Sequence, residues 1–363
     1  MTIYVFLFII LIIGLFPKPL GKSNAYVLIA GVLLFVIIGL RGVSVGIDTL
    51  SYVDDFRYYF NKSWAQIYED AFTHKEPLFY LTVGLITRIT HWYPAYLMFW
   101  ALFPTVALYS VFKDELKKCK IDILLAIIVL FNLGIIAFFQ AGIRQTAAMS
   151  IILLASRNLV KIDNTHFYSF VRDKHFFFFF LGLFIAFCFH KSAFIFILAL
   201  FIKDIKVRWW YVFIPVGTFF LSSYIQLDFI TQAALLVFQN EQYGQYGTSY
   251  QSELSLSLFI MQAIIFIVCY FPRNNVIKQD PHMQAYYNFS VLGLAFASLT
   301  GLIAEMYRLS FYWSMFYIIL LPRSIKAYNN KFVRDIGYAG LIIGSMIYLF
   351  FLSAANLTDF EFF

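Results

Sequence analysis

The chain has 363 residues, of which 61% are hydrophobic and only 13% are charged, with a mean hydropathy of +0.77. This composition excludes an ordinary soluble globular protein, whose surface needs many more charged side chains. The net charge of +7 does not indicate nucleic-acid binding, because the basic residues lie in short connectors between apolar runs. The sequence therefore predicts a polytopic membrane protein.

Apolar runs of about 15 to 20 residues recur along the chain, the length that a membrane-spanning helix needs. The runs are continuous rather than alternating, which favours helices over a barrel. We expect an all-α fold in which residues 1–363 form a single transmembrane domain of about 12 spanning helices and one short half helix. The first run, Met1 to Phe16, lacks a basic n-region and a small-residue cleavage site, which predicts a retained span.

Lysine and arginine are unevenly distributed among the connectors, which predicts the orientation of the chain. Nineteen of the 27 basic residues fall in alternate connectors, at residues 18–22, 113–120, 157–174, 203–208, 273–278 and 323–334. We place these connectors in the cytoplasm and the intervening ones, including 223–253, outside. An odd number of crossings must then separate Arg41 from Lys113. We therefore expect a half helix at Pro77–Ile89, a span at Ala95–Phe112 and both termini outside.

The first outer connector begins with a polar stretch, Arg-Gly-Val-Ser-Val-Gly-Ile-Asp-Thr-Leu-Ser-Tyr, at residues 41–52. Its two glycines permit a sharp turn, and Asp48, Thr49 and Tyr52 follow at the spacing of a helix cap and one helical turn. Asp48 and Glu76 are the outward carboxylates nearest to predicted membrane boundaries. Either can accept a proton from a sugar hydroxyl or hold an arginine in place. The alternatives are a cap for Asp48 and a first-turn acid before Pro77 for Glu76.

Eight basic residues lie outside the predicted cytoplasmic connectors, contrary to the usual enrichment of Lys and Arg on the cytoplasmic side, and are the first places to look for function. They are Arg41, Arg57, Lys62, Lys75, Arg88, Arg144, Lys191 and Arg308. Arg41, Arg144 and Arg308 lie in tight turns near the outer boundary, and guanidinium groups bind phosphate in a bidentate manner. A cluster of three would suit the diphosphate of a lipid carrier. For each arginine the alternative is an interfacial anchor.

Further polar side chains lie at the outer ends of later helices. Gln140, Arg144 and Gln145 form a polar strip on an otherwise apolar helix. His190 ends the phenylalanine-rich run from Phe176, and an imidazole is suited to base catalysis, although an interfacial histidine is also an ordinary amphipathic residue. His74 is a weaker candidate, close to Glu76 in sequence.

The connector at residues 239–253 combines amides, hydroxyls and two glycines with Tyr243, Tyr246 and Tyr250. Sugar rings bind such surfaces by stacking and hydrogen bonding, so we interpret it as a specificity loop or lid, with a disordered linker as the alternative. The cysteines Cys119, Cys188 and Cys269 have neither disulfide nor zinc spacing. We expect no metal and no cofactor, because nucleotide, dinucleotide and metalloprotease motifs are absent from the sequence.

Four motifs occur together in a recognisable order: Arg-Gly-x-x-x-Gly-x-Asp-Thr-x-x-Tyr from Arg41, Glu76-Pro77, Gly-x-Arg-Gln-x-x-Ala around Arg144, and Phe-His-Lys-Ser at 189–192. Over residues 37–192 the chain resembles the EpsG family of Wzy-type polysaccharide polymerases. The resemblance implies a metal-independent glycosyltransferase of the bacterial inner membrane, with GT-C-like architecture and an active site on the periplasmic face. Segments 41–76 and 223–253 would contribute to that site or its lid.

The resemblance also implies roles for particular residues. The growing glycan would leave undecaprenyl diphosphate for the non-reducing end of a fresh lipid-linked repeat unit, in O-antigen, capsule or exopolysaccharide synthesis. Arg41, Arg144, Arg308 and Lys191 would bind the diphosphate, while His190, or alternatively Asp48 or Glu76, would accept the proton. The residues expected to contact substrate are Thr49, Tyr52, Gln140, Gln145, Ser192, Tyr243, Tyr246, Tyr250 and Tyr307.

Other functions compatible with the sequence are an O-antigen ligase or related lipid-linked glycosyltransferase, a lipid-linked oligosaccharide flippase or transporter, and a membrane O-acyltransferase. A flippase should carry charges deep within several spans, whereas here the ionisable residues gather at one predicted face. Expected partners are membrane lipid, lipid-linked oligosaccharides, a chain-length regulator and a flippase, but not nucleic acid.

Overall fold

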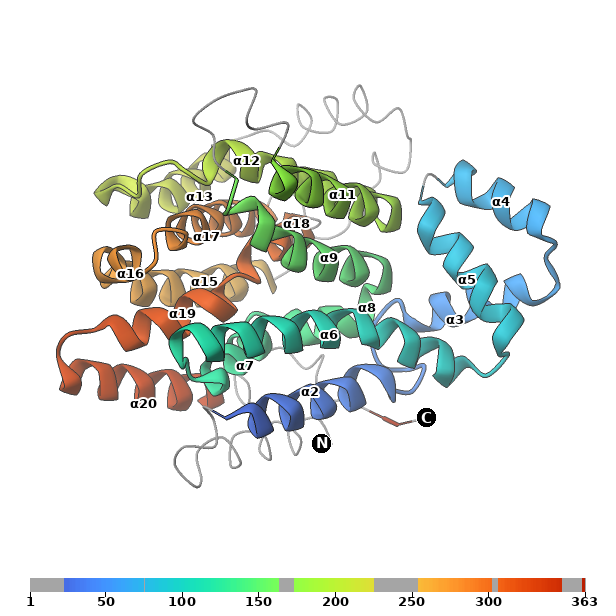
Figure 1. Ribbon diagram of the computed structural model, residues 1–363, viewed down its shortest axis with the longest axis horizontal. Helices are drawn as coiled ribbons and strands as arrows, with labels where there is room; N and C mark the ends of the chain where they lie inside the picture. The colour runs from blue at the N-terminus through green and yellow to red at the C-terminus, as the bar shows by residue number, and fades with distance from the viewer. Residues whose placement is uncertain are drawn as a thin grey trace. The chain divides into compact units, whose positions relative to one another are not determined.

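The computed structural model describes residues 23–74, 76–162, 173–224, 254–301, 306–347 and 361–362 (Figure 1). Within these ranges the fold is all-helical, apart from one antiparallel bridge between Arg41 and Phe362, so the predicted all-α class is confirmed. The chain divides into two compact units, residues 1–200 with 353–363, and residues 201–352. The prediction of a single transmembrane domain remains a prediction.

The first unit contains most of the motifs found in the sequence. Its helices are α2 (Asn24–Gly39), α3 (Thr49–Tyr58), η2 (Tyr59–Asn61), α4 (Trp64–Thr73), α5 (Pro77–Ile89), α6 (Tyr93–Cys119), α7 (Ile123–Asn132), α8 (Ile135–Ala141), α9 (Ile143–Leu159), α11 (Lys174–Phe189) and η3 (Lys191–Leu198). Helix α2 packs along α6, and α9 packs against both α6 and α11. At the α9–α11 contact a Cβ on Gly182 would lie 2.7 Å from the Cβ of Ala155, so only glycine permits this close approach.

The connector at residues 41–76 folds into two short helices, α3 and α4. Helix α4 begins with a capping box, in which the hydroxyl of Ser63 accepts from the Gln66 backbone N–H and the Gln66 side chain accepts from the Ser63 backbone N–H. Its apolar face packs on α5 through Ile67, which lies against Gly84. Helix α5 has the bounds predicted for the half helix and starts with a proline at its first turn.

The beginning of this connector pairs with residues near the end of the chain. The N–H of Gly42 donates to the carbonyl oxygen of Glu361 at 2.7 Å, and the hydroxyl of Ser44 donates to the Glu361 carboxylate at 3.2 Å. Arg41 bridges to Phe362 beside them. Residues 361–362 therefore hold the loop that follows α2.

Glycines interrupt the helices between residues 123 and 159. Gly134, with φ +67°, separates α7 from α8, and Gly142 separates α8 from α9. This second break places Gln140 in the last turn of α8 and Arg144 in the first turn of α9. The tight turn predicted at Arg144 is confirmed, but the polar strip predicted on a single helix is wrong, because Gln140 lies on α8 while Arg144 and Gln145 lie on α9.

The second unit is also helical. After α12 (Ala199–Ile202), which leads into it, its helices are η4 (Trp209–Val212), α13 (Phe213–Tyr224), α15 (Leu254–Tyr270), α16 (Arg273–Gln279), α17 (Met283–Ser298), η6 (Leu299–Gly301), α18 (Met306–Ser314), α19 (Tyr317–Ala327) and α20 (Lys331–Ile347). Helix α17 packs against α13, α15 and α18, and α19 packs against α15 and α20. Within this unit Arg323 pairs with Asp280 at 2.7 Å, so its buried guanidinium has a counter-charge.

Helix α6, with 27 residues, is the one described helix that is long and apolar enough to cross a bilayer alone, and it contains the predicted span 95–112. Two bent pairs, α7 with α8 and the Leu258–Tyr270 part of α15 with α16, reach that length together, with bends of 62° and 64°. Five more described helices are apolar but shorter. The apolar helices indicate a membrane protein; the count of about 12 spans and the GT-C architecture remain predictions.

Candidate active site

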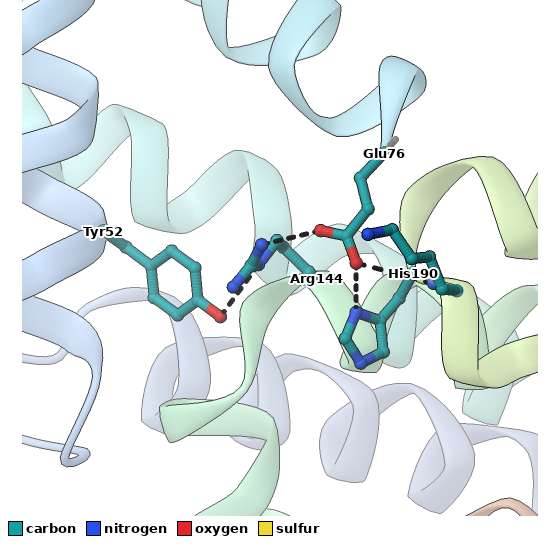
Figure 2. A network of polar contacts seen from close by, with 5 residues as sticks. Tyr52, Glu76, Arg144 and His190 are labelled. Carbon is teal, nitrogen blue, oxygen red and sulfur yellow. Dashed lines mark hydrogen bonds and ion pairs between the residues drawn. The ribbon is translucent and has the colours of Figure 1, made fainter. Parts of the chain in front are cut away.

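The carboxylate of Glu76 lies at the centre of a polar network that joins three distant parts of the chain (Figure 2). Its Oε2 accepts from Nη1 of Arg144 at 2.6 Å, and its Oε1 lies 2.7 Å from Nδ1 of His190. The backbone N–H of Lys191 also donates to Oε1, at 3.5 Å. The side chain of Glu76 is only 6% exposed, whereas those of Arg144 and His190 are 33% and 23% exposed.

Local backbone structure places each of these side chains at the end of a helix. Glu76 is the residue before Pro77, where α5 starts, and Arg144 follows the break at Gly142. His190 ends α11 with an extended backbone, and the chain then turns into η3. Because all three lie at helix ends, their charged groups meet without breaking a regular helix.

Arg144 is also held by aromatic side chains. Its Nε donates to the hydroxyl of Tyr52 at 3.5 Å, and its guanidinium carbon lies 5.7 Å and 5.5 Å from the ring centres of Tyr52 and Phe79. These cation–π contacts and the ion pair fix the orientation of the guanidinium plane. Nη2 forms no hydrogen bond within the described part of the chain, so it remains available to a ligand oxygen.

The network determines which of its members can act as a base. Burial tends to raise the pKa of Glu76, but the hydrogen bond and charge of His190 and the charge of Arg144 outweigh it and lower that pKa below its ordinary value. An ionised carboxylate whose two oxygens are both bonded is a poor proton acceptor. When the imidazole of His190 is neutral, the same carboxylate accepts the hydrogen bond from Nδ1–H and leaves the lone pair on Nε2. His190 is therefore the best-placed base.

Arg41, expected at the diphosphate, lies in the protein interior and is 1% exposed. Nη1 donates to the carbonyl of Ile38, Nε donates to Thr49 Oγ1 at 3.4 Å, and the buried Nη2 has no partner among the described residues. Burial lowers the pKa of Arg41 to about 10, so the group stays charged at neutral pH. Tyr52 lies close enough to interact with the charges of both Arg41 and Arg144.

The second glycine of the Arg41 motif has a steric role. Gly46 has φ +87°, and a Cβ there would lie 2.8 Å from Thr49 Oγ1 and 2.9 Å from the carbonyl oxygen of Gln140. The hydroxyl of Thr49 lies 2.5 Å from the Val45 carbonyl and 3.2 Å from that of Gln140. Thr49 and Gln140, expected to bind substrate, thus fasten the motif to α8.

The remaining predicted residues occupy varied positions. Asp48 is the N-cap residue of α3, where its side chain forms no capping bond; the carboxylate that binds Arg144 and His190 is Glu76. Gln145 is buried in α9, and Ser192 is partly exposed in η3. In the second unit, Nε of Arg308 donates to the hydroxyl of the adjacent Tyr307 at 3.1 Å. Tyr243, Tyr246 and Tyr250 lie outside the described residues.

Sequence reasoning did not single out Asp55, a half-buried acid on α3. The signal available was spacing, because Tyr52, Asp55 and Tyr59 are three and four residues apart and share one face of a helix. Within the described ranges, no group of three or more histidine, cysteine, aspartate or glutamate residues could hold a metal ion.

Apolar helices and a partly buried network of carboxylate, guanidinium and imidazole define a helical membrane protein with an enzyme-like polar centre. The family model for EpsG matches residues 24–362, nearly the whole chain. The chain belongs to the EpsG family, whose members are Wzy-like polymerases, and membership implies a glycosyltransferase-type enzyme of polysaccharide synthesis. Neither the curated proteins nor the solved structures give a match.

Proposed function

We propose that this chain is a polysaccharide polymerase acting on the periplasmic face of the bacterial inner membrane. It transfers a growing glycan from undecaprenyl diphosphate to a hydroxyl at the non-reducing end of a lipid-linked repeat unit. One observation carries the proposal: the Glu76 carboxylate binds Arg144 through one oxygen and His190 through the other. A phosphate-binding group and a base are thereby held on opposite sides of a single side chain.

The reaction needs one proton transfer and one displacement. Nε2 of His190 takes the proton from the acceptor hydroxyl as its oxygen attacks the anomeric carbon of the donor glycan. The bond between that carbon and the diphosphate oxygen breaks, and undecaprenyl diphosphate leaves with the electron pair. The proton later passes from His190 to solvent. The diphosphate is itself the activated leaving group, so the transfer requires no nucleotide.

Each charged residue of the network stabilises one part of this transition state. Nη2 of Arg144 faces the negative charge that develops on the departing diphosphate. Glu76 keeps the proton on Nδ1 of His190 and stabilises the imidazolium that forms. Arg41 adds positive charge from the interior behind Tyr52, without direct contact. We propose Lys191 as a further diphosphate ligand, and a flippase and a chain-length regulator as partners.

The test is a glycan length profile from cells that lack the native gene and carry wild type, Arg144→Ala or His190→Ala, with expression checked by blot. The matched control is Arg57→Ala, because Arg57 is exposed and, among the described residues, pairs only with Asp54 three residues before it. Wild type and the control should give a ladder of polymer, and the two site variants should give single repeat units.

Two results would contradict the proposal. If cells lacking the gene display no repeat unit on their outer surface, export or ligation is the missing step, which favours a flippase or a ligase. If His190→Ala and Arg144→Ala both restore the full ladder, the network is not the catalytic site.

A further inference from the structure

A second cluster of polar side chains lies one helical turn from the network. On α3, Asp55 follows Tyr52 by three residues and precedes Tyr59 by four, so all three lie toward one face. On α5, Tyr80 follows Glu76 by four residues. The side chains from residues 52–59 and those from residues 76–80 are linked at two points. Arg144 links Tyr52 to Glu76, and the rings of Tyr59 and Tyr80 lie 6.1 Å apart. Asp55 therefore lies between these contacts.

An exposed imidazole adjoins this position. His74 ends α4, and its ring stacks on that of Tyr80 with centroids 4.9 Å apart and planes inclined by 28°. Tyr80 is almost completely buried, whereas His74 is exposed. One face of the imidazole is therefore backed by an aromatic ring while the residue remains accessible from outside.

The carboxylate of Asp55 has no hydrogen bond or ion pair with any described residue, although it is half-buried. Burial raises its pKa, and the nearby charges of Arg144 and His74 oppose that rise. The preceding residue, Asp54, is exposed and pairs with Arg57 at 3.0 Å. Adjacent acids on one helix thus differ: one has a local partner, and the other faces the network with its acceptor oxygens available.

We propose that Asp55, His74 and Tyr80 form a sugar subsite beside Arg144, which binds a pyranose ring of the repeat unit through two adjacent hydroxyl groups. The Asp55 carboxylate accepts hydrogen bonds from the two hydroxyls, and the His74 ring, supported by Tyr80, packs against the sugar ring. The subsite rests on the proposed function, because it holds the glycan whose diphosphate Arg144 binds. It adds three residues to the site and names the chemistry they recognise.

The test uses membranes containing the full chain and, as probe, the lipid-linked repeat unit extracted from cells that lack the gene. The variants are Asp55→Asn and His74→Ala, with Asp54→Asn as the matched control. For both subsite variants we expect the KM for the repeat unit to rise about tenfold or more, with kcat within about threefold of wild type. Inhibition by sugar-free undecaprenyl diphosphate should not change, since that molecule bypasses the subsite.

Each outcome decides something different. If wild type forms no polymer from the extracted repeat unit, the proposed function fails, and the subsite fails with it. If wild type is active and both subsite variants keep the wild-type KM, only the subsite is wrong. If inhibition by undecaprenyl diphosphate weakens as much as KM rises, the residues support the diphosphate site, and the subsite is again overturned. If Asp55→Asn lowers the thermal midpoint in detergent, a rise in its KM can come from misfolding. The KM of the His74→Ala variant then decides whether the subsite exists, because His74 is exposed and its substitution should leave folding unchanged.

Discussion

Arg41 and Arg144 are both arginines at helix ends in the same compact unit, yet their surroundings differ. Arg41 is 1% exposed and donates to a backbone carbonyl and a buried hydroxyl, whereas Arg144 is 33% exposed and binds a carboxylate and two aromatic rings. A buried guanidinium bonded to its own loop organises that loop. A partly exposed one with a nitrogen left available can bind a ligand. Residue type alone therefore does not distinguish an arginine that stabilises the fold from one that can bind substrate.

The largest loss of activity is expected from substitution of Glu76, the carboxylate that binds Arg144. Glu76→Gln removes the charge that orients both Arg144 and His190, and polymer formation should fall about a thousandfold. The measurement is the initial rate of polymer formation per amount of folded protein. Glu69→Gln is the control, because Glu69 is an exposed acid on the adjacent helix α4. A rate above a tenth of wild type in Glu76→Gln would show that the carboxylate does not organise the site.

The comparison is tested directly by paired substitutions. Arg144→Ala should lower the rate about a hundredfold and leave folding nearly unchanged. Arg41→Ala should destabilise the protein by about 3 kcal/mol, because it leaves a cavity and unpaired buried acceptors. Thermal midpoints in detergent and rates per folded molecule distinguish the two effects. If the two variants behave alike in both measurements, the distinction between the arginines is wrong.

The loop that carries Arg41 should depend on Gly46. Gly46→Ala places a Cβ against Thr49 and Gln140 at a positive φ, and should cost about 2 to 3 kcal/mol of stability. Gly134→Ala is the control, because Gly134 also has a positive φ but a Cβ there meets no atom within 4 Å. Equal losses of thermal stability would show that backbone strain alone, rather than the contact with Gln140, makes glycine necessary.

The smallest effect concerns pH. Since the pKa of Glu76 in the folded protein lies below its ordinary value of 4.5, its charged form stabilises the fold fully above that pH. The contribution is lost as pH falls below 4.5 and through the folded-state pKa. The stability difference between wild type and Glu76→Gln should thus shrink as pH falls from about 5 through the folded-state pKa of Glu76. A difference that grows over this acidic range would reverse the sign of the shift.

The sequence predicted several elements well because their signals are local. Pro77 at a helix start and the glycine break before Arg144 mark boundaries that the structure reproduces. Glu76, Arg144 and His190 were each predicted as site residues. Their pairing was not predicted, since it joins residues 68 and 114 positions apart. Asp55 was missed because an acid in a polar connector looks ordinary until its neighbours are known.

The burial of Arg41 also depends on distant sequence, because its loop pairs with residues 361–362. The contact between Ser44 and Glu361 spans 317 positions. A ribosome synthesises the chain from its N-terminus, so α2 and its loop emerge long before residues 361–362 are made. Until residues 361–362 arrive, the backbone at residues 41–42 lacks its pairing partner. Completion of the arginine motif is therefore a late event in biogenesis, and nascent chains stalled before that point should present this loop to proteases.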